Sequence, residues 1–140
     1  MRQQTRLTAT PNGPDLADTR ALVRGLVAQD FTAVGDALAP HVHLRALLPA
    51  GLREWMGVDV VADRFERWFG DTERFDLVEA IAGEVGGRTH LRWRFRLQAR
   101  RLGTGTFVVE QAAYADVEVG AGIARLDLLC TGYLLEASGG

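Results

Sequence analysis

The chain has 140 residues, a formal net charge of −2 and 47% apolar residues. This length suits one domain with a hydrophobic core, and no apolar run is long enough to span a membrane. The small net charge gives no overall field for nucleic acid, so we expect neither a membrane nor a nucleic acid as partner. The single cysteine, Cys130, cannot form an internal disulfide, and residues 1–14 lack the apolar segment of a secretory signal. We therefore expect a cytoplasmic protein.

Both ends of the chain are polar. Residues 1–14 contain Pro11 and Pro14, and residues 136–140 are small and polar. We expect flexible tails over these two stretches, on either side of a single domain of residues 15–135.

Three segments in the first half of the domain have apolar residues at helical spacing. The first spans residues 14–29. Asp30 is placed to cap a second helix over residues 31–38, and Asp59 to cap a third over residues 59–69. Five apolar residues are expected on the inner face of the third helix: Val60, Val61, Phe65, Trp68 and Phe69.

Residues 41–48, between the second and third helices, are β-like and lead into the turn Pro49-Ala-Gly51. Residues 52–56 predict either a second short strand or an irregular rim. Trp55 is the large residue of that segment.

From Phe75 onward the apolar residues alternate with polar ones, which is typical of strands with one buried face. The stretch 88–99 alternates without a break, with Leu91, Trp93, Phe95 and Leu97 on one side and Arg92, Arg94, Arg96 and Gln98 on the other. Short Gly-containing loops between the segments predict an antiparallel meander, which the helices must cover on its apolar face. Its four strands are expected at residues 75–84, 88–100, 107–119 and 123–135.

This order of elements resembles the nuclear-transport-factor-2-like superfamily, in particular its SnoaL-like and ketosteroid-isomerase-like branch. The resemblance is carried by residues 38–48 leading through Gly57 into residues 58–69, and by residues 123–129; it covers residues 15–135. It implies an α+β fold of the NTF2-like or cystatin-like roll type. In such a fold a cone-shaped, curved antiparallel sheet packs on three N-terminal helices, and a small-molecule cavity lies at the open end.

The resemblance also allows two family chemistries to be tested residue by residue. Ketosteroid-isomerase-like members carry a general-base Asp near the end of the strand before the third helix. Residues 41–48 contain no carboxylate, and Ala46 is the nearest match to that position. Limonene-epoxide-hydrolase-like members use an Arg-x-Asp on a central strand, whereas the comparable strand here reads Arg92-Trp-Arg94. The usual catalytic carboxylates are therefore absent.

The arginines of residues 88–100 could form an anion-binding or nucleic-acid face. However, Trp93 and Phe95 point to the opposite side and could not stack on bases held by those arginines. Cross-strand pairs with carboxylates are the simpler interpretation. Because Arg94 and Tyr114 are residue types enriched at interfaces, and because the family's sheets often pair back to back, we expect a homodimer through this outer face. The carboxylates available for pairing are Glu110, Asp116, Glu118 and Asp127.

His41 and His43 lie on the same side of the predicted strand and could begin a metal site. A third ligand would have to be His90 or Glu54, and no spacing supports either residue. A polar strand edge is the alternative interpretation. We expect no metal and no cofactor.

Gln111 is the polar residue expected on the inner face of the sheet, where a buried amide needs partners. It either binds the helices or offers a polar contact in a cavity lined by tryptophans. Asp127 is either a buried acid with a raised pKa or a surface partner of an arginine, and Cys130 is interpreted as a core residue. The candidate ligand-binding residues are Trp55, Trp93, Gln111, Tyr114, Asp127, Arg45 and His43.

Two functions follow from these observations. The first is a SnoaL-like pocket for a small apolar compound of polyketide or terpenoid type, with isomerase, cyclase or hydrolase activity. The alternative is a non-catalytic module for dimerisation or ligand binding. Polar groups that converge in an open cavity would favour the first function, and a cone filled by side chains would favour the second.

Overall fold

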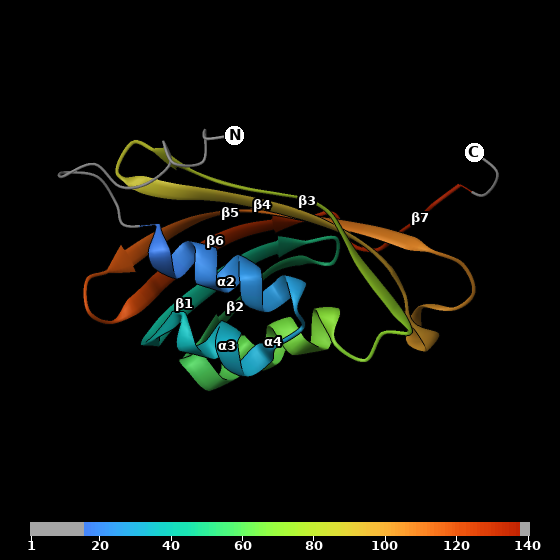
Figure 1. Cartoon of the computed structure of the whole chain (residues 1–140), viewed down its shortest axis with the longest axis horizontal. Helices are drawn as coiled ribbons and strands as arrows, with labels where there is room; N and C mark the ends of the chain where they lie inside the picture. The colour runs from blue at the N-terminus through green and yellow to red at the C-terminus, as the bar shows by residue number, and fades with distance from the viewer. Residues whose placement is uncertain (1–15, 138–140) are drawn as a thin grey trace.

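The computed structural model describes residues 16–137, so the predicted start of the first helix and most of both predicted tails lie outside the described residues. Within this part of the chain, helices come first and a long set of strands follows (Figure 1). The elements are α2 (Ala17–Val27), α3 (Phe31–Asp36), β1 (Leu38–Leu48), β2 (Gly51–Met56), α4 (Val58–Phe69), β3 (Arg74–Val85), β4 (Arg88–Gln98), the short 3-10 helix η1 (Arg100–Leu102), β5 (Phe107–Glu118), β6 (Gly122–Cys130) and β7 (Leu134–Leu135).

The strands form one curved sheet in the order β2-β1-β6-β5-β4-β3, with β7 added beside β5. The predicted antiparallel meander is confirmed, because β3, β4, β5 and β6 pair in succession with antiparallel neighbours. The segment 52–56 is a strand, β2, which pairs with β1 as a hairpin. One neighbouring pair departs from the antiparallel pattern, since β1 and β6 are parallel. Parallel neighbours need a long connection, and here β2, α4 and β3 to β5 lie between the two strands along the chain.

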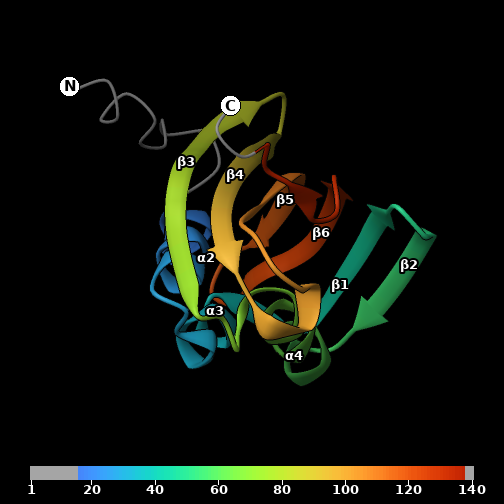
Figure 2. The same ribbon diagram turned by 90° about the vertical axis from the view of Figure 1, so that its right-hand side faces the viewer.

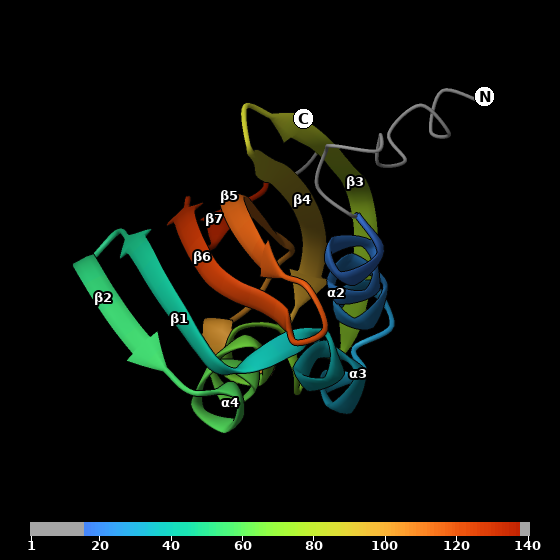
Figure 3. The ribbon, with the colours of Figure 1, turned by 90° about the vertical axis from the view of Figure 1, so that its left-hand side faces the viewer.

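The helices cover one face of the sheet, and the sheet curves around them (Figures 2 and 3). Leu22 and Leu26 of α2 are fully buried against this face, as are Phe65 and Phe69 of α4. Each pair is spaced by four residues, so both side chains project from the same side of their helix. Val60 was predicted to belong to the inner face of α4 but is half exposed, because it lies off the row formed by Val61, Phe65 and Phe69.

The helix ends differ in part from the prediction. Asp30 caps α3 as expected, because its carboxylate accepts a hydrogen bond of 3.1 Å from the Ala33 N–H. Gly57, and not Asp59, precedes the first turn of α4; its φ of 95° belongs to the region that favours glycine. The Gly57 N–H donates to the Val42 carbonyl, so the end of the β1–β2 hairpin is tied directly to the start of the helix.

The alternation in β4 is confirmed, since the four apolar residues of the strand are fully buried while the arginines between them reach the convex face. The last predicted strand, residues 123–135, is interrupted after Cys130. Residues 131–133 leave the sheet through Gly132, which has a φ of 79°, and the chain returns as β7 against the start of β5. The pairs that hold it there are Phe107 with Leu135 and Val108 with Leu134.

Candidate functional site

The seven candidate ligand-binding residues divide between the two faces of the sheet. Trp55, Trp93 and Gln111 lie on the concave face, where the helices pack. The other four candidates lie on the convex face, as the pairing of Arg45 with Asp127 and of Tyr114 with Asp127 requires. The structure therefore does not bring the seven residues into one site. Those on the convex face are His43, Arg45, Tyr114 and Asp127.

A buried polar pair occupies the middle of the concave face. Trp93 on β4 and Gln111 on β5 are opposite each other in the register, and both are fully buried. The Trp93 Nε1–H donates to Gln111 Oε1 at 3.0 Å. The Gln111 Nε2 amide group has no hydrogen-bond partner among the described residues. Because a buried donor without a partner is costly, an acceptor such as a water molecule or a ligand group would be stabilised beside this amide.

Aromatic rings lead from this pair to the surface. Phe65 lies 6.4 Å from Trp93 and 5.4 Å from Trp68, measured between ring centroids. Trp68 in turn meets Trp55 edge-to-face at 5.7 Å, and these last two rings are only partly buried. The Arg64 guanidinium lies 4.6 Å from the centre of the Trp55 ring, within the range of a cation–π contact. Packed side chains of α4 and of the edge strand β2 thus lie between the buried amide and the surface.

Arg101 and Tyr133 bind the C-terminal end of α4, and we call this pair of residues the polar latch. The Tyr133 hydroxyl donates to the Trp68 carbonyl at 2.5 Å, and Arg101 donates to the same carbonyl at 2.8 Å. Arg101 also donates to the Gly70 carbonyl at 3.1 Å, so both residues satisfy carbonyls at the negative end of the helix. Burial raises the pKa of the Tyr133 phenol, and the nearby Arg101 charge partly opposes this rise.

Sequence reasoning did not identify the latch. Arg101 and Tyr133 contact a helix end that is 33 and 65 residues away in the chain. The signal for a helix C-terminus is normally a basic residue within the helix itself. A cation supplied by a distant loop leaves no such local pattern.

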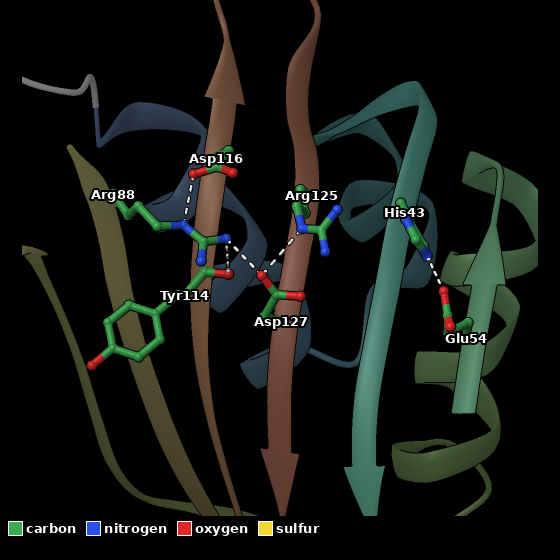
Figure 4. A network of polar contacts seen from close by, with 7 residues as sticks. All are labelled: His43, Glu54, Arg88, Tyr114, Asp116, Arg125 and Asp127. Atoms are coloured by element: carbon green, nitrogen blue, oxygen red, sulfur yellow. Dashed lines mark hydrogen bonds and ion pairs between the residues drawn. The ribbon is translucent and has the colours of Figure 1, made fainter. Parts of the chain in front are cut away.

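An ionic network covers the convex face (Figure 4). Arg88 donates to Asp116 through Nε and to Asp127 through Nη2, both at 2.8 Å, and Arg125 donates to Asp127 at 3.2 Å. Burial alone would raise the pKa of the Asp127 carboxyl, but the bonds and charges of Arg88 and Arg125 outweigh it and lower the pKa below its ordinary value. The hypothesis of an acid with a raised pKa is wrong, and the alternative of a carboxylate paired to arginine is confirmed.

The convex face also has an apolar groove of about 510 Å³ beside this network. Leu47 and Leu52 are half exposed there, and Leu129 is 55% exposed. The centroids of the His90 and Tyr114 rings lie 4.9 Å apart along the groove, with the ring planes tilted by 38°. The lining residues are Arg45, Leu47, Leu52, His90, Ala112, Tyr114, Asp127, Leu128 and Leu129.

The two histidines that were considered as the start of a metal site pair with carboxylates. His43 Nε2 lies 2.7 Å from Glu54 Oε1, and His41 Nε2 lies 3.3 Å from Glu118 Oε1. Over residues 16–137, no cluster of three or more His, Cys, Asp or Glu side chains could hold a metal ion. In the same part of the chain no helix combines the length and the apolar character needed to cross a membrane.

The concave side offers little for acid–base chemistry. The fully buried polar or charged side chains of the described part are Thr19, Thr89 and Gln111, none of which titrates near neutral pH. Ala46, the residue matched to the family's general base, is fully buried on the concave face beside Leu128. The arrangement suits binding of a neutral group better than transfer of a proton.

A larger hollow, of about 1110 Å³, lies outside the cone between α3, α4 and the start of β1. None of the seven candidate residues lines it. Its polar lining includes Asp30, Asp36, Asp59, Asp63 and Glu66. We do not place the site there, because the buried unpartnered amide faces the other side of α4.

Comparison with solved structures supports the fold, whereas the comparisons of sequence find no match. No model of a protein family matches the chain, and no curated protein matches it in sequence. Among solved structures, a candidate polyketide cyclase from Xanthomonas campestris pv. campestris aligns with a TM-score of 0.61 at 18% identity, over 80% of this chain and 86% of that one. A hypothetical protein with a ketosteroid isomerase-like fold from Catenulispora acidiphila, solved with trimethylamine, aligns with a TM-score of 0.63 at 14% identity, over 84% and 85% of the two chains.

A third neighbour is a candidate SnoaL-like polyketide cyclase from Shewanella denitrificans, with a TM-score of 0.61 at 9% identity over 81% of this chain and 87% of that one. Each alignment spans most of both chains, so the likeness extends to the whole domain and not to a shared hairpin. The expected α+β cone is confirmed, and the chain has the nuclear-transport-factor-2-like fold found in SnoaL-like and ketosteroid-isomerase-like proteins.

Proposed function

We propose that this chain binds a small, uncharged, largely apolar molecule on the concave side of its sheet. The observation that carries the proposal is the fully buried Gln111 amide, whose nitrogen has no hydrogen-bond partner among the described residues. A row of packed rings extends from its neighbour Trp93 to the partly exposed Trp55. Apolar walls with a single placed polar group are typical of small-molecule sites. The polyketide cyclases among the structural neighbours are consistent with such a ligand.

We favour binding over catalysis for this site. A general acid or base must lie within hydrogen-bond reach of the proton that it transfers. The fully buried polar groups of the described residues are two threonines and one glutamine, and Ala46 has no proton to give. The isomerase, cyclase or hydrolase activity considered from the sequence would therefore need a reaction driven by positioning alone.

The test is to look for a ligand that accompanies the protein. Protein purified without any added compound would be examined by native mass spectrometry, and its organic extract by mass spectrometry of small molecules. We expect about one neutral compound per chain, and a crystal structure of the same sample should show it against Gln111. A chain of unmodified mass, together with a cone filled by its own side chains in the crystal, would refute the proposal.

We also propose that the protein forms a homodimer through its convex face. Leu47, Leu52 and Leu129 are each about half exposed there, and Tyr114 lines the same groove. Two sheets that pack face to face would bury these side chains in both copies.

Molar mass in solution, measured by light scattering after gel filtration, tests the dimer. We expect the mass of two chains for the wild type and of one chain for Leu129→Glu, which places a carboxylate in the apolar groove. Val119→Glu is the matched control, because Val119 is 97% exposed in the turn between β5 and β6. A wild-type protein that elutes as one chain would exclude this interface.

A further inference from the structure

Two rows of side chains, one polar and one apolar, cross neighbouring strands at the groove on the convex face. The polar row, in the order β1, β6, β5 and β4, consists of Arg45, Asp127, Tyr114 and His90. The apolar row occupies the next position on the same face, and in the order β2, β1, β6 and β5 it consists of Leu52, Leu47, Leu129 and Ala112. Both rows line the groove, whose volume of about 510 Å³ lies within the range of small-molecule sites. The groove therefore has one polar side and one apolar side.

Arg45 is the charged group of this groove without a partner. Its guanidinium makes no hydrogen bond or ion pair with any described residue. Asp127 and Glu54 flank it in the register, but both carboxylates are bound elsewhere. Asp127 accepts hydrogen bonds from two other arginines, and Glu54 lies 2.7 Å from the His43 ring nitrogen. The partly buried Arg45 thus keeps its donors available for an anion with two acceptor oxygens.

The apolar row gives the length of a matching hydrocarbon. Its four residues lie on four successive strands of the sheet, so the row extends over about three strand spacings, or about 14 Å. An extended alkyl chain of about ten carbons has roughly this length. Its contact with the three half-exposed leucines would remove apolar surface from water on both sides.

We propose that the convex groove binds a free amphipathic carboxylate, with its carboxylate on Arg45 and its alkyl chain along the apolar row. This site is separate from the ligand site proposed on the concave side. It shares its surface with the proposed dimer, because a ligand and a second copy would both cover Leu47, Leu52 and Leu129. The two occupants therefore compete for the groove.

Probes of equal chain length separate the charge from the hydrocarbon. Titration calorimetry would compare decanoate, decan-1-ol and decylammonium, all below the concentrations at which they form micelles. We expect decanoate to bind about tenfold more tightly than decan-1-ol, as for one charge-assisted hydrogen bond at a partly exposed site. Decylammonium should bind most weakly of the three. Butanoate keeps the carboxylate and loses most of the chain, so it should bind at least tenfold more weakly than decanoate.

Two variants at Arg45 test its contact with the ligand. Arg45→Met removes the charge and keeps the length of the side chain, so it should bind decanoate and decan-1-ol equally. Arg45→Lys keeps the charge and should retain part of the preference for decanoate. Arg53→Met is the matched control, because Arg53 lies on β2 opposite Ala46, on the other face of the sheet. It should leave the preference unchanged.

A filled groove should exclude every ten-carbon probe. Ala112→Phe places a ring at the end of the apolar row and should weaken decanoate and decan-1-ol alike. A crystal structure with decanoate should show its carboxylate on Arg45, which tests the site without any substitution. The inference is refuted if the wild type binds decanoate and decan-1-ol equally, if Arg53→Met lowers the preference as much as Arg45→Met, or if decanoate lies on the concave side in the crystal.

Light scattering with and without decanoate distinguishes this inference from the proposed dimer. Decanoate should convert a wild-type dimer into single chains. If decanoate binds through Arg45 while the mass of two chains persists, the convex-face dimer fails and the groove site stands. If the protein is a dimer and no probe binds to it or to the single chains of Leu129→Glu, the groove serves the second copy and the inference is refuted. If the wild type is a single chain and no probe binds, both fail, whereas a neutral compound extracted from the protein bears on the concave site alone.

Discussion

Arg88 donates to Asp127 at 2.8 Å although the two residues belong to β4 and β6, with the whole of β5 between them. The same guanidinium donates to Asp116 on the intervening strand. One long side chain therefore connects three neighbouring strands on the convex face. This face has a mixed-charge pattern in the sequence, and the pairing explains why its arginines do not form an open cationic surface.

The low pKa of Asp127 predicts how this network responds to acid. The carboxyl stays ionised in the folded protein at a pH where the unfolded chain already binds a proton, so its stabilising effect is complete above about pH 4 and is lost as the pH falls further. Asp127→Asn should lower the free energy of unfolding at neutral pH by about 1 kcal/mol, a modest value because the Asp127 side chain is 30% exposed. Urea unfolding should show this difference shrinking below pH 4.

Asp63→Asn provides the control for that experiment. Asp63 pairs with Arg67 one turn further along α4, on an exposed surface. We expect a smaller loss at neutral pH than for Asp127→Asn. Equal losses in the two variants would show that the convex network contributes nothing beyond an ordinary surface pair.

Tyr133 should ionise at unusually high pH. The chain has two tyrosines, so in a Tyr114→Phe background the ultraviolet signal of phenolate comes from Tyr133 alone. Because burial raises its pKa, we expect the midpoint to lie above the ordinary value of about 10. The unfolded chain loses this proton first, so the stability of the fold should decline as the pH rises above 10 and through the folded pKa. A midpoint at or below 10 would mean that Tyr133 is not held against α4.

Gly122 is a position where the fold has no room for a side chain. A methyl group there would lie 2.9 Å from the Ala37 oxygen and 3.0 Å from the Leu38 carbonyl carbon, and φ is 113°. Gly122→Ala should therefore cost about 2 kcal/mol or more in the free energy of unfolding, from overlap with backbone and from strain.

Two other glycines separate these causes. Gly120 has a φ of 81° but open space around it, so Gly120→Ala should show strain alone, about 1 kcal/mol. Gly87 has open space and no left-handed φ, and Gly87→Ala should lie within about 0.5 kcal/mol of the wild type. If all three variants unfold alike, the close contact of Gly122 with the start of β1 is absent in solution.

The face of the sheet on which a side chain lies could be predicted from the sequence, because it depends on the local alternation of apolar and polar residues. The alternation within each strand placed Trp93 and Gln111 on the inner face and Tyr114 on the outer face, and the register confirms all three. The same rule warned that side chains of opposite parity cannot share a pocket. Arg45 and Asp127 were nevertheless grouped with Gln111, because parity between strands depends on the register of β1 against β6, and no local pattern encodes it.

The rest of the site depends on contacts between distant segments. The bond between Trp93 and Gln111 requires β4 and β5 to pair at one register out of several, although both residues could be named in advance. The contacts of Tyr133 need the chain to leave the sheet at Gly132, where a continuous strand was expected. Side-chain partners of this kind follow from the assembled fold and leave no trace in spacing.

The buried pair itself gives the last prediction. Trp93→Phe removes the indole donor and leaves Gln111 Oε1 without a partner, while Gln111→Leu leaves the Trp93 N–H without one. Each single change should therefore cost more than the removal of one hydrogen bond, because the remaining group stays desolvated. The double variant removes both polar groups, so its loss should be smaller than the sum of the single losses by about 1 kcal/mol. Loss of indole volume occurs in both Trp93→Phe backgrounds and cancels in the cycle. Chemical unfolding of the four proteins measures this coupling, and a value near zero would show that the hydrogen bond between Trp93 and Gln111 does not stabilise the fold.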